Sequence, residues 1–309
     1  MEIYLGFFIC CIVAVLFGVF LAKRQARVFS TPDQTKQSDG TSGQDALPIA
    51  NHFDYGDMRF LHLGTPAVQG SMKISSPYEI HLEYVQRMMA WLLFVDLDKL
   101  KQMHAMQLGL GAASLTKFCY KNLGMQTTAI ELNPNVIETC RLWFNLPEND
   151  HRLQVLVGDA ADAVANDAWQ GKIDVLQVDL YDQDAELPCL DSEFFYKNCR
   201  ELLSDTGCMA VNLFGSKSNI PDSIYKIANA FGPDALWVFK PASANTIVLA
   251  LRTPTLRDKS SLIAQATAIE SRWSLPATKW LDIFIAKIIN LKKELPPCKI
   301  KEGLRLINK

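Results

Sequence analysis

Strand-like and helix-like segments alternate along the chain between residues 105 and 251, and this alternation sets the fold class. Short apolar stretches typical of strands lie at residues 105–110, 127–132, 153–157, 173–180 and 208–213. Helical segments are expected between them, at residues 115–123, 135–144, 194–203 and 223–231. The pattern predicts an α/β fold with a doubly wound parallel sheet, because repeated βαβ units cross over with one hand. Two short strands, 236–239 and 246–251, fit a closing antiparallel pair.

The N-terminus carries the pattern of a membrane anchor. Residues 3–22 are a run of about 20 residues without a charge, which is long enough to cross a bilayer as a helix. Glu2 precedes the run and Lys23, Arg24 and Arg27 follow it, so the positive-inside rule predicts that the rest of the chain lies at the cytoplasmic face. A cleaved secretory signal fits less well, because its first part is basic rather than acidic. A buried core helix is the other alternative.

The remaining sequence divides into segments of different composition. We expect an anchor with its basic flank over residues 1–29 and a polar, flexible linker over residues 30–50. Residues 51–100 predict a small β-hairpin subdomain and a connecting helix at 78–94, and residues 101–255 form the sheet domain. Residues 256–309 predict a helical tail with a basic end, either solvated or in contact with a membrane surface.

Charge and cysteine content exclude several classes of protein. The chain has 31 basic and 33 acidic residues, so its net charge of −2 gives no overall field for nucleic acid. Its eight cysteines include no CxxC pair and no Cys/His cluster with metal-ligand spacing. They are interpreted as reduced, buried thiols rather than as a disulfide framework, and no metal site is predicted.

The residues after the first two strands are candidates for a ligand site, because such sheets bind ligands beyond the carboxyl ends of their strands. The first strand leads into Gly109-Leu110-Gly111, where glycine lets the backbone turn tightly and approach a ligand closely. Packing of the next helix is the alternative reason for these glycines. Glu131 ends the second strand, where an acidic side chain can accept hydrogen bonds from both ribose hydroxyls of a nucleoside. A capping or solvated role is the alternative for Glu131.

The third and fourth strands also end in acidic residues. Asp159, followed by Ala160, can accept a hydrogen bond from an adenine amino group, or it can cap the next helix. Asp179 and Asp182 follow a nearly apolar strand and can converge on one cationic ligand, unless they only stabilise a turn. The sequence therefore predicts a nucleoside cradle that faces an acidic pocket. This combination suits a sulfonium donor of the S-adenosyl type and a cationic amine.

These motifs resemble the spermidine synthase (polyamine aminopropyltransferase) family, in particular its divergent spermidine-synthase-like branch, over roughly residues 55–252. The resemblance implies a Rossmann-like, methyltransferase-type sheet, a dimer, and no metal. It also implies transfer of an aminopropyl group from decarboxylated S-adenosylmethionine to a polyamine such as putrescine. Asp179 would help to deprotonate or orient the amine, and Gly109, Gly111, Glu131, Asp159 and Ala160 would bind the adenosyl group. Asp182, Gln86 and Gln69 would bind the amine.

The chain departs from this family on the amine side. Ala112 stands where the glycine-rich loop of the family carries an Asp that holds the aminopropyl ammonium, and only Gln86, with Tyr84, matches the helix motif. The resemblance therefore leaves open whether the chain is an enzyme. An S-adenosylmethionine-dependent methyltransferase and a non-catalytic, membrane-tethered protein that binds an adenosyl ligand are the alternative functions.

Overall fold

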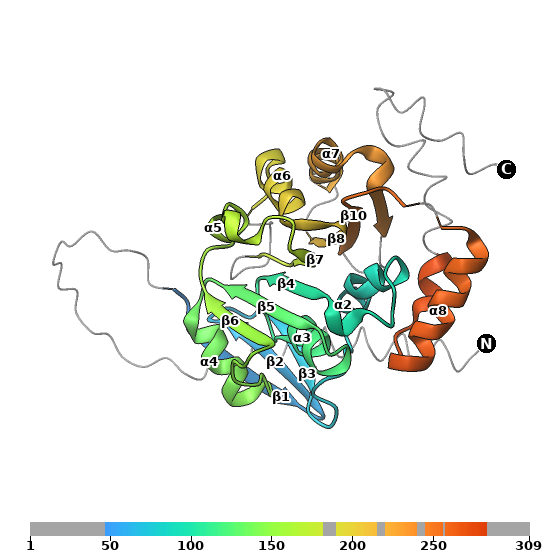
Figure 1. The fold of residues 1–309 in the computed structure, drawn as a ribbon. Coiled ribbons are helices and arrows are strands. Elements are labelled where there is room, and N and C mark those ends of the chain that lie inside the picture. Colours follow the sequence, from blue (N-terminus) through green and yellow to red (C-terminus); the bar gives the residue numbers. More distant parts are fainter. Residues whose placement is uncertain (1–46, 182–189, 215–219, 240–244, 256, 283–309) are drawn as a thin grey trace, which may run out of the picture. The chain divides into compact units, whose positions relative to one another are not determined.

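The computed structural model describes residues 47–181, 190–214, 220–239, 245–255 and 257–282. Its compact unit begins at Pro48 and contains two sheets (Figure 1). The predicted membrane segment, residues 3–22, lies outside the described residues. Within the described part of the chain, no helix combines the length and apolarity that crossing a bilayer requires.

The smaller sheet is antiparallel, with strands in the order β1-β2-β3. These strands are β1 (Ala50–Tyr55), β2 (Met58–Leu63) and β3 (Val68–Lys73). The sequence predicted the hairpin of β2 and β3 but placed β1 at the junction of the linker and the subdomain. Leu61 of β2 and Met72 of β3 are buried against the loop after β4 and helix α4 (Pro134–Trp143). The small sheet is thereby fixed over one end of the larger one.

The larger sheet has seven strands in the order β6-β5-β4-β7-β8-β10-β9. Its strands are β4 (His104–Leu108), β5 (Gln126–Glu131), β6 (Leu153–Val157), β7 (Ile173–Val178), β8 (Leu203–Leu213), β9 (Leu236–Phe239) and β10 (Thr246–Leu251). Strands β4 to β8 pair in parallel, whereas β10 runs antiparallel to both β8 and β9. The predicted α/β class and the closing antiparallel pair are both confirmed.

Helices cover both faces of this sheet, as the alternation of strand residues requires. Ala105 of β4 faces one layer and Met106 faces the other. The first layer holds α2 (Glu83–Met88), η1 (Met89–Leu93), α3 (Ser114–Lys117), η3 (Phe118–Asn122) and α8 (Lys259–Trp273). The second layer holds α5 (Ala160–Val164), α6 (Glu193–Leu202) and α7 (Ile220–Phe231). Short helical turns η2 (Leu100–Gln102), η4 (Asp167–Trp169) and η5 (Pro233–Ala235) complete the connections.

Two predicted helices differ from the structure. The expected helix at 78–94 is the short α2 followed by the 3₁₀ turn η1, in which Met89 to Leu93 are all fully buried. A segment buried on every side is not held to one amphipathic face, so the apolar spacing overestimated its α-helical length. In the tail, α8 confirms the first predicted helix, and most of the second lies outside the described residues.

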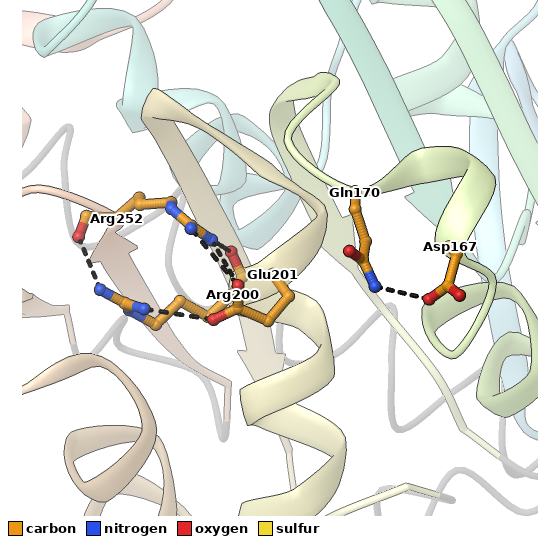
Figure 2. A network of polar contacts seen from close by, with 5 residues as sticks. All are labelled: Asp167, Gln170, Arg200, Glu201 and Arg252. Carbon is orange, nitrogen blue, oxygen red and sulfur yellow. Dashed lines mark hydrogen bonds and ion pairs between the residues drawn. The ribbon is translucent and has the colours of Figure 1, made fainter.

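A polar network fastens α6 to the strands at the amino ends of the parallel strands (Figure 2). Both terminal guanidinium nitrogens of Arg252 lie 3.3 Å from Oε2 of Glu201, and Arg252 also donates to the carbonyl of Arg200. In return, Nη2 of Arg200 lies 3.5 Å from the carbonyl oxygen of Arg252. Nearby, Gln170 donates to Asp167 over 2.6 Å. These contacts hold the end of the sheet that lies away from the candidate site.

Candidate functional site

A cavity of about 360 Å³ lies at the carboxyl ends of the central strands, next to the small sheet. Its wall contains seven of the predicted site residues, namely Gln69, Gly109, Gly111, Glu131, Asp159, Ala160 and Asp179. The strand ends therefore converge on one cavity, as the topology of the parallel sheet predicted. The volume is in the range of small-molecule sites in proteins.

Gly109 brings the loop after β4 into close contact with the end of β7. Its φ of +82° lies in the left-handed region that favours glycine, and a Cβ at this position would lie 2.2 Å from the carbonyl oxygen of Asp179. The approach is held by two backbone hydrogen bonds, from Gly109 to Ile130 over 2.9 Å and from Asp179 to Leu108 over 3.0 Å. The glycine thus serves a close approach of backbone to backbone beside the cavity.

Glu131 is held by backbone amides at the end of β5. Its Oε2 accepts a hydrogen bond from Leu110 N and its Oε1 accepts one from Asn133 N, both over 2.8 Å. Burial raises the pKa of the Glu131 carboxyl, and the backbone donors oppose this effect. A carboxylate has about four acceptor positions, so two fixed donors leave capacity for hydroxyl groups of a ligand.

Asp159 both caps a helix and lines the cavity. Its Oδ1 accepts a hydrogen bond from Ala161 N over 2.7 Å, at the N-cap of α5. The capping interpretation is therefore correct, and it is compatible with a ligand contact because Gly158, Asp159 and Ala160 all belong to the cavity wall. The cap fixes the carboxyl group at the edge of the cavity.

Asp179 occupies the other end of the cavity and is partly buried. Its Oδ1 accepts a hydrogen bond from Nδ2 of Asn212 over 2.9 Å. Burial raises the pKa of Asp179 to about 6, although the Asn212 hydrogen bond acts in the opposite direction. Tyr84 is nearby, because burial and then the charge of Asp179 raise the pKa of its hydroxyl. An aspartate with this pKa is a stronger base than an ordinary one.

The structure does not bring every predicted residue to this cavity. Gln86 is not part of the described cavity wall, and its Nε2 donates to the carbonyl of Ile80 over 2.8 Å. Its neighbour Tyr84 lines the cavity instead, because residues two apart on a helix point in different directions. Asp182 lies outside the described residues. Ala112 is only 4% exposed and packs against Gly70, away from the cavity.

Several wall residues were missed by the sequence analysis: Leu180, Tyr181, Leu190, Asn212, Phe214 and Asn245. Asn212 left a detectable signal, because it is a polar residue one position before the end of an otherwise apolar stretch in β8. The same reasoning had identified Asp179. Asn245 stands immediately before β10, whose antiparallel direction brings the start of that strand to the site. The sequence did not predict that reversal firmly enough to use it.

The sheet order and the small N-terminal sheet define a Rossmann-like, methyltransferase-type protein. Among solved structures, a probable spermidine synthase from Corynebacterium glutamicum matches with a TM-score of 0.59 and 16% identity, covering 77% of this chain and 87% of the other. Human methyltransferase-like protein 13 in complex with SAH matches with a TM-score of 0.56 and 21% identity, over 63% and 93% of the two chains. These likenesses establish the fold.

Sequence comparison assigns the family. The chain is 30% identical over 233 residues to the polyamine aminopropyltransferase of Chromobacterium violaceum, covering 75% of this chain and 87% of the relative. The protein of the same name from Neisseria meningitidis is 30% identical over 231 residues, with 74% and 86% covered. No family model matches the chain. The chain belongs to the polyamine aminopropyltransferase family.

Proposed function

We propose that the protein transfers an aminopropyl group from decarboxylated S-adenosylmethionine to a small amine such as putrescine. The observation that carries this proposal is the partly buried carboxylate of Asp179, at the opposite end of one cavity from Glu131. One end offers acceptors for the hydroxyl and amino groups of an adenosyl unit, and the other offers negative charge for a cation. The relatives named polyamine aminopropyltransferase support the same reaction.

The bound donor would supply an electrophilic carbon beside its sulfonium, and methylthioadenosine would leave when the amine nitrogen attacks that carbon. In this proposal, Glu131 holds the ribose and Asp159 with Ala160 holds the adenine. Asp179 orients the attacking amine and accepts its proton. The pKa of about 6 improves the match between this base and neutral pH, while the cavity provides alignment. Gln69 and Asp182 are assigned to the amine.

The proposal is tested by incubating the purified protein with decarboxylated S-adenosylmethionine and a series of amines, and by measuring methylthioadenosine. Asp179→Asn should lower its release by at least about a hundredfold, the scale of a lost general base. Asp205→Asn is the matched control, because Asp205 is exposed and is not part of the described cavity wall. Absence of methylthioadenosine with every amine would contradict the proposal.

One observation favours methyl transfer as the second candidate. Ala112 is buried against Gly70, so this position presents no carboxylate to the donor. A methyl donor keeps its own carboxylate, which an acidic neighbour would repel. Transfer of a labelled methyl group from S-adenosylmethionine to a cell extract would support this alternative. If calorimetry detects no binding of either adenosyl ligand, the non-catalytic alternative is favoured over both reactions.

We further propose that the enzyme is a homodimer held at the cytoplasmic face of a membrane by residues 3–22. The uncharged run and the basic residues after it support the anchor, and membership of the family supports the dimer. The segment boundaries given above from the sequence are part of this proposal. Carbonate washing of membranes and light scattering of the protein in detergent are the corresponding tests.

A further inference from the structure

Asn212 forms a directed hydrogen-bond relay with Asp179 and Asn245. Asn212 is only 4% exposed, and its Nδ2 lies 2.9 Å from Oδ1 of Asp179. An ionised carboxylate only accepts hydrogen bonds, so Asn212 must turn its NH₂ group toward Asp179 and its oxygen away. That oxygen lies 3.0 Å from Nδ2 of Asn245, which therefore donates to it. The relay runs from Asn245 through Asn212 to Asp179.

The backbone around Asn212 is clamped to the loop that carries Asp179. The Tyr181 hydroxyl donates to the carbonyl of Asn212 over 2.6 Å and accepts from the amide of Phe214. The Tyr181 ring also meets the Phe214 ring edge to face, with centroids 6.1 Å apart. The end of β8 and the loop after β7 are thus joined by side chain and backbone together. Asn212 has little freedom to present its amide in any other direction.

We propose that Asn212, oriented by Asn245, is the positioning residue of Asp179, directing the carboxylate toward the acceptor amine and keeping it ionised at neutral pH. The catalytic part of this inference rests on the proposed function. The relay engages Oδ1 and leaves the remaining acceptor positions of the carboxylate for a ligand. Asn212 is not expected to touch the reacting atoms, and it acts through Asp179.

The balance of forces on Asp179 shows what the relay achieves. Burial favours the protonated form and the Asn212 hydrogen bond favours the charged form, which together give a pKa of about 6. Removing one hydrogen bond to a charged group changes such a balance by about one pH unit. The other titratable groups in the described cavity wall, Tyr84, Tyr181, Glu131 and Asp159, stay in place. The carboxylate would then be about half protonated near pH 7.

The decisive experiment is a carboxyl ¹³C titration of the full chain, with the Asp179 resonance assigned from Asp179→Asn. Asn212→Leu keeps the size of the side chain and removes the donor, and we expect the pKa of Asp179 to rise by about one pH unit. Asn245→Ala frees the Asn212 amide and should give a smaller rise. Asn229→Leu is the matched control, because Asn229 donates to Glu193 over 3.0 Å at an exposed site. It should leave Asp179 unchanged.

Activity separates positioning from ionisation. At pH 8.5 the carboxylate is ionised in every variant, so the remaining loss in kcat/KM for the amine, about tenfold in Asn212→Leu, reports orientation. At pH 6 the same variant should lose about a further fivefold, because less of its Asp179 is ionised.

Three outcomes decide the inference. An unchanged Asp179 titration in both Asn212→Leu and Asn245→Ala overturns the relay. If Asn212→Leu does not fold, the titration of Asn245→Ala alone decides it. If the wild-type protein releases no methylthioadenosine, the proposed function and the catalytic part fail, whereas the titration still decides whether Asn212 controls Asp179.

Discussion

Replacing Gly109 by alanine should destabilise the protein and damage the adenosyl site together. The new Cβ would lie 2.2 Å from the carbonyl oxygen of Asp179, in a backbone conformation with φ of +82°. Relief of this overlap requires the loop after β4 and the end of β7 to separate by about 1 Å, since real Cβ atoms essentially never approach within 3.0 Å. Neither neighbour can yield by rotating a side chain, because the contact is with backbone.

The magnitude follows from two contributions. The left-handed conformation costs an alanine about 1 kcal/mol. Separating the two segments weakens the hydrogen bonds from Gly109 to Ile130 and from Asp179 to Leu108, at about 1 kcal/mol each. The free energy of unfolding should therefore fall by about 3 kcal/mol, which for a domain of this size corresponds to a Tm lower by about 9 °C.

A matched glycine isolates the steric contribution. Gly171 has a φ of +67°, and a Cβ there would meet nothing within 4 Å. Gly171→Ala should cost only the conformational part, about 1 kcal/mol. Urea unfolding followed by circular dichroism measures both variants, and calorimetry with methylthioadenosine measures the site. Equal unfolding midpoints for the two variants would refute the inferred close approach.

Three further predictions concern charge and location. Because the pKa of Asp179 is raised to about 6, the stability gained by its protonation is complete below the unfolded-state pKa near 4 and is lost as pH rises through 6. Asp179→Asn should therefore increase the unfolding free energy at pH 8 by about 2 kcal/mol in thermal denaturation, even as activity is lost. Burial lowers the pKa of Lys117 to about 8, below its unfolded-state value, so the unfolding free energy should rise between pH 8 and 10. Lys117→Met should remove that rise in urea titrations at the two pH values. Deletion of residues 3–22 should release the protein from membranes on fractionation, and retention would contradict the anchor.

Much of the fold was predictable because buried parallel strands leave a strong apolar signal. The stretches at 153–157, 236–239 and 246–251 were predicted with the boundaries that the structure shows. By contrast, β8 begins at Leu203, directly after α6, where the sequence predicted helix up to residue 203 and a strand only from residue 208. No turn residue separates the two elements at that junction. Local sequence patterns therefore place the centres of elements better than their ends.

The site was predictable to the extent that one topological rule covers it. Glycines and acids at the ends of parallel strands converge on the cavity, and Asp179 and Glu131 were found in this way. Gln86 was assigned from the resemblance alone, and a contact of its amide with Ile80 keeps it elsewhere. Asn245 depends on the antiparallel strand β10 and on a partner, Asn212, that is distant in sequence. Such long-range pairs leave no periodic signal.

The packing of Ala112 against Gly70 makes the glycine-rich loop resistant to simple engineering. A Cβ on Gly70 would lie 2.8 Å from the Cβ of Ala112, so the two backbones already touch with the smallest side chains available. Grafting an acidic residue onto position 112 alone would drive a charge into an apolar wall rather than into the donor site. Any redesign of donor preference would have to rebuild strand and loop as a coupled pair.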